Sequence, residues 1–235
     1  MTASNRSWDA YPKTYRAKEM KRLADWIQAG ESGAVGGLVG CGRSNLLGFL
    51  CYRPQVLTDA NYLPEGAPGA ALIPVDLNDL PANNLATLYR IILRSFDRVS
   101  EHLEPTLQRT VQQLYQEHLR EQDSFVTQSA LHDLLLLFQA QQTRVALVLN
   151  RFDRFCNRAT PEMINTLRAL RDNFKDTLCY IVGMRQEVAY LDNPEALGDM
   201  YDLLDTQVCW VGTMRKKDPR FVVDQATHFA DRPPT

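Results

Sequence analysis

The sequence predicts an α/β domain built on a mostly parallel sheet of five strands, with helices on both faces. Amphipathic helical segments alternate with short apolar segments along the chain, as they do in parallel-sheet proteins. A glycine-rich turn also joins the first apolar segment to the helix that follows it. The short apolar segments, which are typical of buried strands, are residues 33–40, 70–76, 145–149, 178–182 and 207–211.

The predicted helices follow from apolar residues that recur at helical spacing. Residues 15–28 show this pattern, and Gly30 behind them predicts the end of the helix. The helix after the glycine-rich turn is expected to begin at Ser44. Three more helices, which together form a large helical insert at about residues 83–142, are expected at about residues 83–102, 105–121 and 124–142.

Individual residues mark the limits of these elements. Ser124 is expected to cap its helix, because a side-chain oxygen there can accept from an unpaired backbone N–H group. Thr160 and Pro161 open another helix, with threonine as the cap and proline in the first helical position. Pro74 has no N–H for a hydrogen-bond ladder, so the second strand is expected at an edge of the sheet.

Composition and charge exclude several classes of protein. The chain has 235 residues, of which 45% are apolar and 23% charged, as in an ordinary globular domain. A net charge of −2 gives no overall basic field for nucleic acid. No apolar segment approaches the roughly 18 residues of a membrane span, and the N-terminus lacks the apolar region of a signal peptide. Five cysteines without a C-x-x-C pair and four scattered histidines indicate reduced thiols, no zinc site and a cytoplasmic protein.

Residues 37–44 form the central motif of the sequence. They fit the phosphate-loop pattern G-x-x-x-x-G-K-[ST], except that Arg43 stands in the place of the lysine. The glycines let successive backbone N–H groups face phosphate oxygens, and the N-terminus of the next helix faces the same anion. Arg43 would offset phosphate charge, and the Ser44 hydroxyl can ligate Mg²⁺. The alternative is a turn whose glycines serve packing alone. The predicted nucleotide-binding residues are Gly37, Gly40, Cys41, Gly42, Arg43, Ser44 and Asn45.

A second group of candidates follows the strand at residues 145–149. Phosphate-loop ATPases usually place an aspartate here to hold Mg²⁺, often followed by a glutamate that orients water. In this chain Asn150 and Arg151 occupy these two positions. Asp153 is a candidate to reach the metal from the loop, and the alternative is a local cap or an ion pair with Arg151 or Arg154. The predicted Mg²⁺ ligands are therefore Ser44, Asn150 and Asp153.

Two other strand ends carry charged residues. Asp76 follows the second strand, either as a site residue or as a cap of the next turn. Arg185 follows the fourth strand, from which it could contact a γ-phosphate and sense its presence. Asp153 and Arg185 are accordingly the candidates for catalytic residues.

With these motifs the chain resembles the nucleotide-binding domains of AAA+ and STAND proteins, including their NB-ARC and NACHT relatives. The resemblance implies a three-layer P-loop NTPase fold with sheet order 5-1-4-3-2, bound ATP or ADP with Mg²⁺, and a protein partner or self-association through the AAA+ type surface. It covers roughly residues 12–215, and its motifs are the lead-in Tyr15-Arg16-x-x-Glu19, residues 37–44, residues 145–153 and Gly183-Met184-Arg185.

Departures from the family pattern shape the functional prediction. Arg43 replaces the lysine, Asn150 replaces the aspartate, and no catalytic glutamate follows. The resemblance therefore implies an ATP- or ADP-binding signalling switch that is at most a slow ATPase. The expected domain organisation is an N-terminal arm at residues 1–14, a nucleotide-binding domain at 15–214, and a tail at 215–235 without a lid domain.

Two alternative functions stay open at this stage. The first is a GTPase in which Asn150 and Asp153 read guanine, as in the N-K-x-D motif, although no D-x-x-G follows any predicted strand. The second is a non-catalytic pseudo-ATPase module that recruits a protein or DNA partner. Only the short basic run at residues 215–217 points toward nucleic acid, and nothing points toward a membrane.

Overall fold

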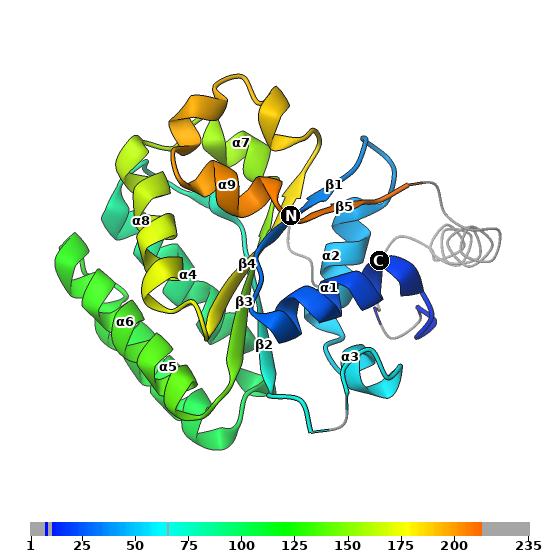
Figure 1. Cartoon of the computed structure of the whole chain (residues 1–235). Helices are drawn as coiled ribbons and strands as arrows, with labels where there is room; N and C mark the ends of the chain where they lie inside the picture. The colour runs from blue at the N-terminus through cyan, green and yellow to red at the C-terminus, as the bar shows by residue number, and fades with distance from the viewer. Residues whose placement is uncertain (1–7, 9–10, 65, 213–235) are drawn as a thin grey trace, which may run out of the picture.

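The computed structural model describes residues 8, 11–64 and 66–212 of the chain. Parallel strands form one five-stranded sheet in the order β2-β3-β4-β1-β5, with helices on both faces (Figure 1). This arrangement confirms the predicted fold class and strand order. The strands are β1 (Gly33–Gly36), β2 (Ala70–Val75), β3 (Arg144–Asn150), β4 (Leu178–Met184) and β5 (Val208–Trp210).

Among the described residues, three helices cover one face of the sheet. They are α1 (Ala17–Ala29), α2 (Arg43–Tyr52) and α3 (Val56–Asp59). Gly30 ends α1 in the left-handed conformation, as the sequence predicts. Small strand residues such as Ala146 and Cys179 face this layer, and they let α1 and α2 pack close to the sheet.

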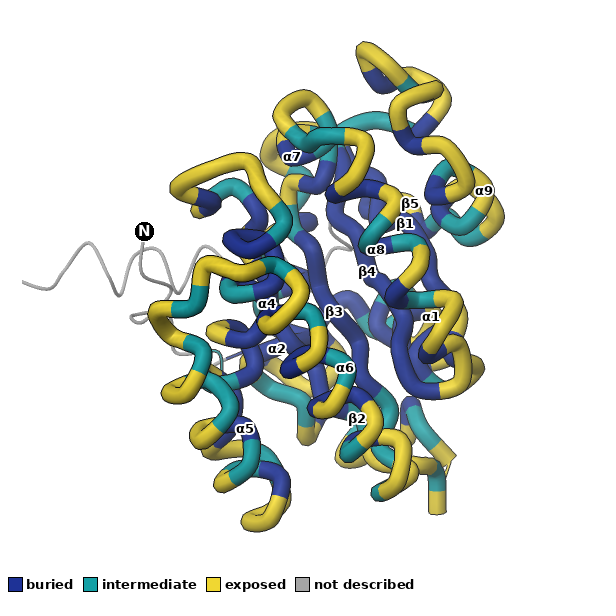
Figure 2. The backbone as a smooth tube through the Cα atoms, turned by 90° about the vertical axis from the view of Figure 1, so that its left-hand side faces the viewer, coloured by how far each residue is buried: buried dark blue, intermediate teal, exposed yellow. Residues whose placement is uncertain are grey.

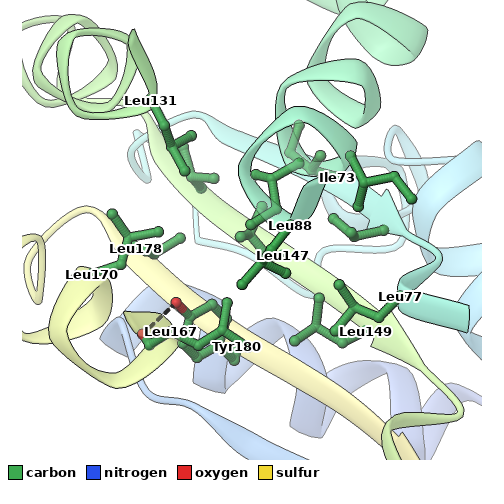
Figure 3. Close-up of a cluster of buried hydrophobic side chains, with 14 of the residues drawn as sticks. Ile73, Leu77, Leu88, Leu131, Leu147, Leu149, Leu167, Leu170, Leu178 and Tyr180 are labelled. Carbon is green, nitrogen blue, oxygen red and sulfur yellow. Dashed lines mark hydrogen bonds between the residues drawn. The ribbon is translucent and has the colours of Figure 1, made fainter. Parts of the chain in front are cut away.

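The opposite face carries a thicker layer. α4 (Leu85–Val99), α6 (Ser124–Ala140), α8 (Pro161–Asn173) and α9 (Met200–Asp205) bury leucine and aromatic side chains from the other side of the strands (Figure 3). α5 (Pro105–His118) packs on α4 and α6, and most of its surface is exposed (Figure 2). The predicted helical insert therefore contributes α4 and α6 to the layer against the sheet and α5 outside them. Shorter elements complete it: α7 (Phe152–Cys156), η2 (Leu77–Asp79), η3 (Ser100–His102), η4 (Val188–Tyr190) and η5 (Pro194–Leu197).

Most of the predicted element limits agree with the structure, but β1 ends at Gly36 rather than at residue 40, and one predicted cap is wrong. Pro74 lies in β2, which is an edge strand, and Thr160 accepts from the backbone N–H of Met163 as a cap. The predicted cap Ser124 is wrong, because Asp123 accepts from the Phe125 N–H at 2.8 Å. A carboxylate at this position also interacts favourably with the positive end of the helix dipole. Within the described residues, no helix has the length and hydropathy of a membrane span.

Tyr180 gives a test of the packed core. Its hydroxyl donates to the Leu167 carbonyl at 2.6 Å (Figure 3), and burial raises its pKa above the ordinary value. We expect Tyr180→Phe to lower the free energy of unfolding by about 1–2 kcal/mol, because a buried carbonyl loses its donor. Tyr190→Phe, at an exposed ring, is the matched control and should change stability by less than about 0.5 kcal/mol. Equal urea midpoints for the two variants would contradict this expectation.

Candidate functional site

The glycine-rich loop lies at the carboxyl edge of the sheet, between β1 and α2 (Figure 1). Gly40 and Gly42 have φ angles of 86° and 90°, which L-residues with a side chain rarely adopt. No hydrogen bond from a side chain caps the N-terminus of α2 in the described structure. A helix N-terminus without such a cap is an arrangement that binds anions.

Arg43 is folded into the loop rather than extended from it. Its side chain is only 7% exposed, and its Nη1 donates to the Gly37 carbonyl at 3.2 Å. Burial lowers the pKa of the Arg43 guanidinium from its ordinary value, while the nearby Asp153 carboxylate acts in the opposite direction. The guanidinium stays protonated at neutral pH, and its buried Nε has no hydrogen-bond partner among the described residues. A buried cation thus lies beneath the loop with donor capacity left over.

A cavity of about 360 Å³ opens beside this loop. Two hydrophobic residues at the tip of the loop, Leu38 and Val39, line it and are 77% and 84% exposed. Five of the predicted nucleotide-binding residues also line it: Gly40, Gly42, Arg43, Ser44 and Asn45.

Gly37 and Cys41 do not line the cavity, and their described role is to shape the loop. A Cβ atom on Gly37 would lie 2.6 Å from the Cys41 Sγ atom, so only glycine fits there. The remaining lining residues are three arginines, namely Arg151, Arg154 and Arg185. The sequence pattern indicates no role for Arg154 beyond an ion pair with Asp153, because the distance between Arg154 and the loop along the chain gives no local signal.

Asn150 lies directly against the phosphate loop. Its Nδ2 donates to the Ser44 Oγ at 3.2 Å, and its Oδ1 accepts from the Arg151 N–H at 3.0 Å. Because a backbone N–H can only donate, this second bond fixes which end of the amide faces Ser44. Gly183, its neighbour on β4, makes room, since a Cβ there would lie 2.9 Å from the Asn150 Oδ1.

The position of Asn150 bears on the guanine-reading hypothesis. A side chain that contacts Ser44 lies at the phosphate end of the site. A residue that reads the base must instead lie beyond the ribose and the phosphates. This contact therefore argues against Asn150 and Asp153 as readers of guanine.

The other predicted charged residues, Asp153, Arg185 and Asp76, interact with neighbouring groups of the protein. The Asp153 side chain is 12% exposed, and its Oδ2 lies 3.7 Å from the Arg185 Nε. The two candidates for catalytic residues thus form an ion pair at the cavity wall. Asp76 accepts from the Asn78 N–H at 3.0 Å and caps a 3₁₀ turn, which is the structural alternative considered above.

Arg16 binds the backbone of the glycine-rich loop through its guanidinium group. Its side chain is 2% exposed; Nη2 donates to the Cys41 carbonyl at 2.5 Å, and Nη1 donates to the Gly212 carbonyl at 2.9 Å. Glu19, also in the lead-in motif, lies 3.6 Å from the same guanidinium. The motif therefore fixes the loop backbone to the segment that follows β5.

The predicted Mg²⁺ ligands Ser44, Asn150 and Asp153 turn few oxygen atoms toward a common point. Mg²⁺ requires oxygen ligands, whereas Asn150 presents an N–H group to Ser44 and keeps its oxygen on the backbone. Asp153 supplies one carboxylate, which is already paired with Arg185. Within the described residues there is no group of three or more His, Cys, Asp or Glu side chains that could hold a metal ion. The protein side chains alone therefore supply few oxygen ligands for a divalent cation, and the buried Asp153 Oδ1 is the one carboxylate oxygen at the site without a hydrogen-bond partner among the described residues.

Comparison of the fold with solved structures gives clear matches at low sequence identity. ORC2 of Aeropyrum pernix, solved as ADPNP–ADP complexes, matches 91% of this chain with a TM-score of 0.59 and 15% identity. The Walker-type ATPase PABY2304 of Pyrococcus abyssi matches 97% with a TM-score of 0.57 and 15% identity. The fold is that of AAA+ P-loop ATPase domains.

The same fold recurs in a third neighbour, and all three are longer proteins. ORC1 of Aeropyrum pernix, solved in complex with DNA, matches 91% of this chain with a TM-score of 0.55 and 12% identity. The matches span 51%, 63% and 49% of the three neighbours, so this chain corresponds to about half or somewhat more of each. No protein-family model and no curated protein sequence matches the chain.

Proposed function

We propose that this AAA+ type domain binds ATP or ADP at the glycine-rich loop and acts as a nucleotide-dependent switch with slow or no hydrolysis. The observation that carries the proposal is the loop itself, with two glycines at positive φ, an uncapped helix N-terminus and an arginine-lined cavity. Each of these features suits a polyphosphate anion. The ADPNP and ADP bound to the ORC2 neighbour support an adenine nucleotide.

We expect weak hydrolysis because Asn150 and Arg151 lie at the end of β3. Asn150 replaces the carboxylate that would hold Mg²⁺, and Arg151 replaces the one that would orient water. Arginine does not accept a proton at neutral pH, so it cannot act as a general base. Residues that bind phosphate are thus retained beside a centre that lacks the groups for turnover.

The direct test is calorimetric titration of the chain with ATP, ADP and GTP, combined with a phosphate-release assay. We expect the adenine nucleotides to bind at least about tenfold more tightly than GTP, which corresponds to about 1.4 kcal/mol. Turnover is expected below about 1 s⁻¹, the lower end of ordinary enzymes. Binding of GTP alone would overturn the adenine assignment, and turnover above that rate would overturn the switch.

Failure to bind any nucleotide would favour the second candidate, a non-catalytic pseudo-ATPase module that recruits a protein or DNA partner. The observation in its favour is the direct contact between the Asn150 amide and the Ser44 hydroxyl, which places an N–H group on the hydroxyl expected to ligate Mg²⁺. The exposed side chains of Phe125 and Leu136 on α6 are then the first surface to mutate in a search for the partner.

Restoring the ordinary residues tests why hydrolysis is weak. We expect the double variant Arg43→Lys with Asn150→Asp to hydrolyse ATP at least about tenfold faster than the wild-type chain in the presence of Mg²⁺. A carboxylate beside Ser44 provides the oxygen that Mg²⁺ requires. The matched control makes the same changes at exposed positions, Arg109→Lys with Asn173→Asp, and should leave turnover unchanged. Equal turnover in both variants would show that these two residues do not limit hydrolysis.

A further inference from the structure

The charge around the cavity is strongly positive. Arg43, Arg151, Arg154 and Arg185 line it, and Asp153 is the carboxylate paired with this group. A nucleoside triphosphate bound as its Mg²⁺ complex carries two fewer negative charges than the free nucleotide. Four guanidinium groups beside one carboxylate therefore match the free polyphosphate better than its metal complex.

The contact between Asn150 and Ser44 adds a second, geometric argument. The Asn150 Nδ2 hydrogen, which carries partial positive charge, points at the Ser44 hydroxyl oxygen, which is the atom expected to ligate Mg²⁺. Rotation of the amide would present Oδ1 instead, but it would remove the acceptor of the Arg151 N–H. The local backbone thus holds the amide in the orientation that repels a metal ion.

A third observation comes from the buried cation beneath the loop. Arg43 is 7% exposed, yet its Nε has no partner among the described residues and its Nη1 makes one bond to the loop carbonyl. Leaving charged donor capacity buried is unfavourable unless an anion completes it. The Asp153 carboxylate already acts on Arg43, and the cavity that Arg43 lines has room for a further anion.

We propose that the site binds its nucleotide as the metal-free polyphosphate anion, with the arginines supplying the positive charge that Mg²⁺ supplies in other phosphate loops. Guanidinium groups can each donate two parallel hydrogen bonds to phosphate oxygens, which a compact ammonium cannot. The inference rests on the proposed function, since it specifies the form in which ATP or ADP binds at the same loop.

The deciding experiment is calorimetric titration of the full chain with ATP, once in EDTA and once in excess Mg²⁺, at matched ionic strength. We expect ATP to bind at least as tightly in EDTA as in Mg²⁺. Tighter binding in Mg²⁺ would overturn the metal-free inference and leave nucleotide binding intact. Binding in neither condition would overturn the proposed function together with the inference.

Two variants sharpen the result. Asp153→Asn keeps the shape of the side chain and removes its negative charge, so we expect ATP to bind about threefold or more tightly in EDTA. If Asp153 ligated a metal, the same change would instead weaken binding in Mg²⁺, and that outcome would overturn the inference. Arg154→Gln should weaken ATP binding in EDTA about tenfold, because a charged donor to phosphate is lost.

The matched control is Arg109→Gln on the exposed side of α5, away from the cavity. It removes the same charge from the protein as a whole and should leave the dissociation constant unchanged within about twofold. An equal loss in the Arg109 and Arg154 variants would mean that net charge alone governs binding, which would also overturn the inference.

Discussion

Gly42→Val is expected to weaken the binding of ATP at least about 100-fold. Gly42 has a φ angle of 90° at the N-terminus of α2, and a β-branched residue is strongly disfavoured in this region. Valine would rotate the adjacent peptide groups toward negative φ and turn the N–H groups of the loop away from the phosphates. Because several hydrogen bonds to a charged ligand are lost together, the expected loss of binding exceeds that of any single side chain.

Gly66→Val provides the matched control for this variant. Gly66 also has a positive φ, of 78°, and no described atom lies within 4 Å of a Cβ placed there. It lies in the segment before β2, at the amino edge of the sheet, away from the loop. Both variants should lose about 1–2 kcal/mol of stability through strain, and the loss of ATP binding should be confined to Gly42→Val. Wild-type affinity in a folded Gly42→Val variant would contradict a phosphate site at the loop.

Arg16→Ala is expected to lower the free energy of unfolding by about 3–5 kcal/mol, the range for losing one partner of a buried charged pair. Two backbone carbonyls, of Cys41 and Gly212, lose a charged donor, and Glu19 loses its nearest cation. Unfolding in urea, followed by circular dichroism, measures the effect. Since the Cys41 carbonyl belongs to the phosphate loop, the affinity for ATP should fall in the same variant.

Two other substitutions separate the charge of Arg16 from its geometry. Arg16→Lys keeps the charge, but one ammonium cannot replace a fork that reaches two carbonyls, so we expect about half of the loss in stability. Lys18→Ala removes an exposed cation from the same helix and should change stability by less than about 0.5 kcal/mol. If Arg16→Ala unfolds within 1 kcal/mol of the wild-type chain, the buried contacts contribute little.

The sequence predicts the sheet and the long helices of this domain because their signals are local. Residues 145–149 and 178–182 are continuous apolar segments, and both lie within the observed strands β3 and β4. α3, α7 and α9 were not predicted, because helices of four to six residues are too short to show a helical period. The predicted arm and tail lie largely outside the described residues, so the domain limits stay a prediction.

Local sequence signals likewise predict some features of the candidate site and leave others unpredicted. The loop at residues 37–44 could be predicted, because its glycines and Ser44 are consecutive and their spacing carries the chemistry. The arrangement of the Asn150 amide could not, since it depends on a backbone N–H in the next residue and on a missing Cβ at Gly183. The contact of Arg16 with Gly212 joins residues 196 positions apart, and no local pattern encodes such a pair.

One guanidinium therefore connects the place where a nucleotide would arrive to the place where the polypeptide leaves the sheet. Any part of the protein that follows Gly212 begins a single side chain away from the Cys41 carbonyl. If the loop backbone shifts on ligand binding, we expect the geometry of both hydrogen bonds to change, because they share one rigid guanidinium. A change at the loop could then reach the segment after β5 through Arg16 alone, without a rearrangement of the hydrophobic core.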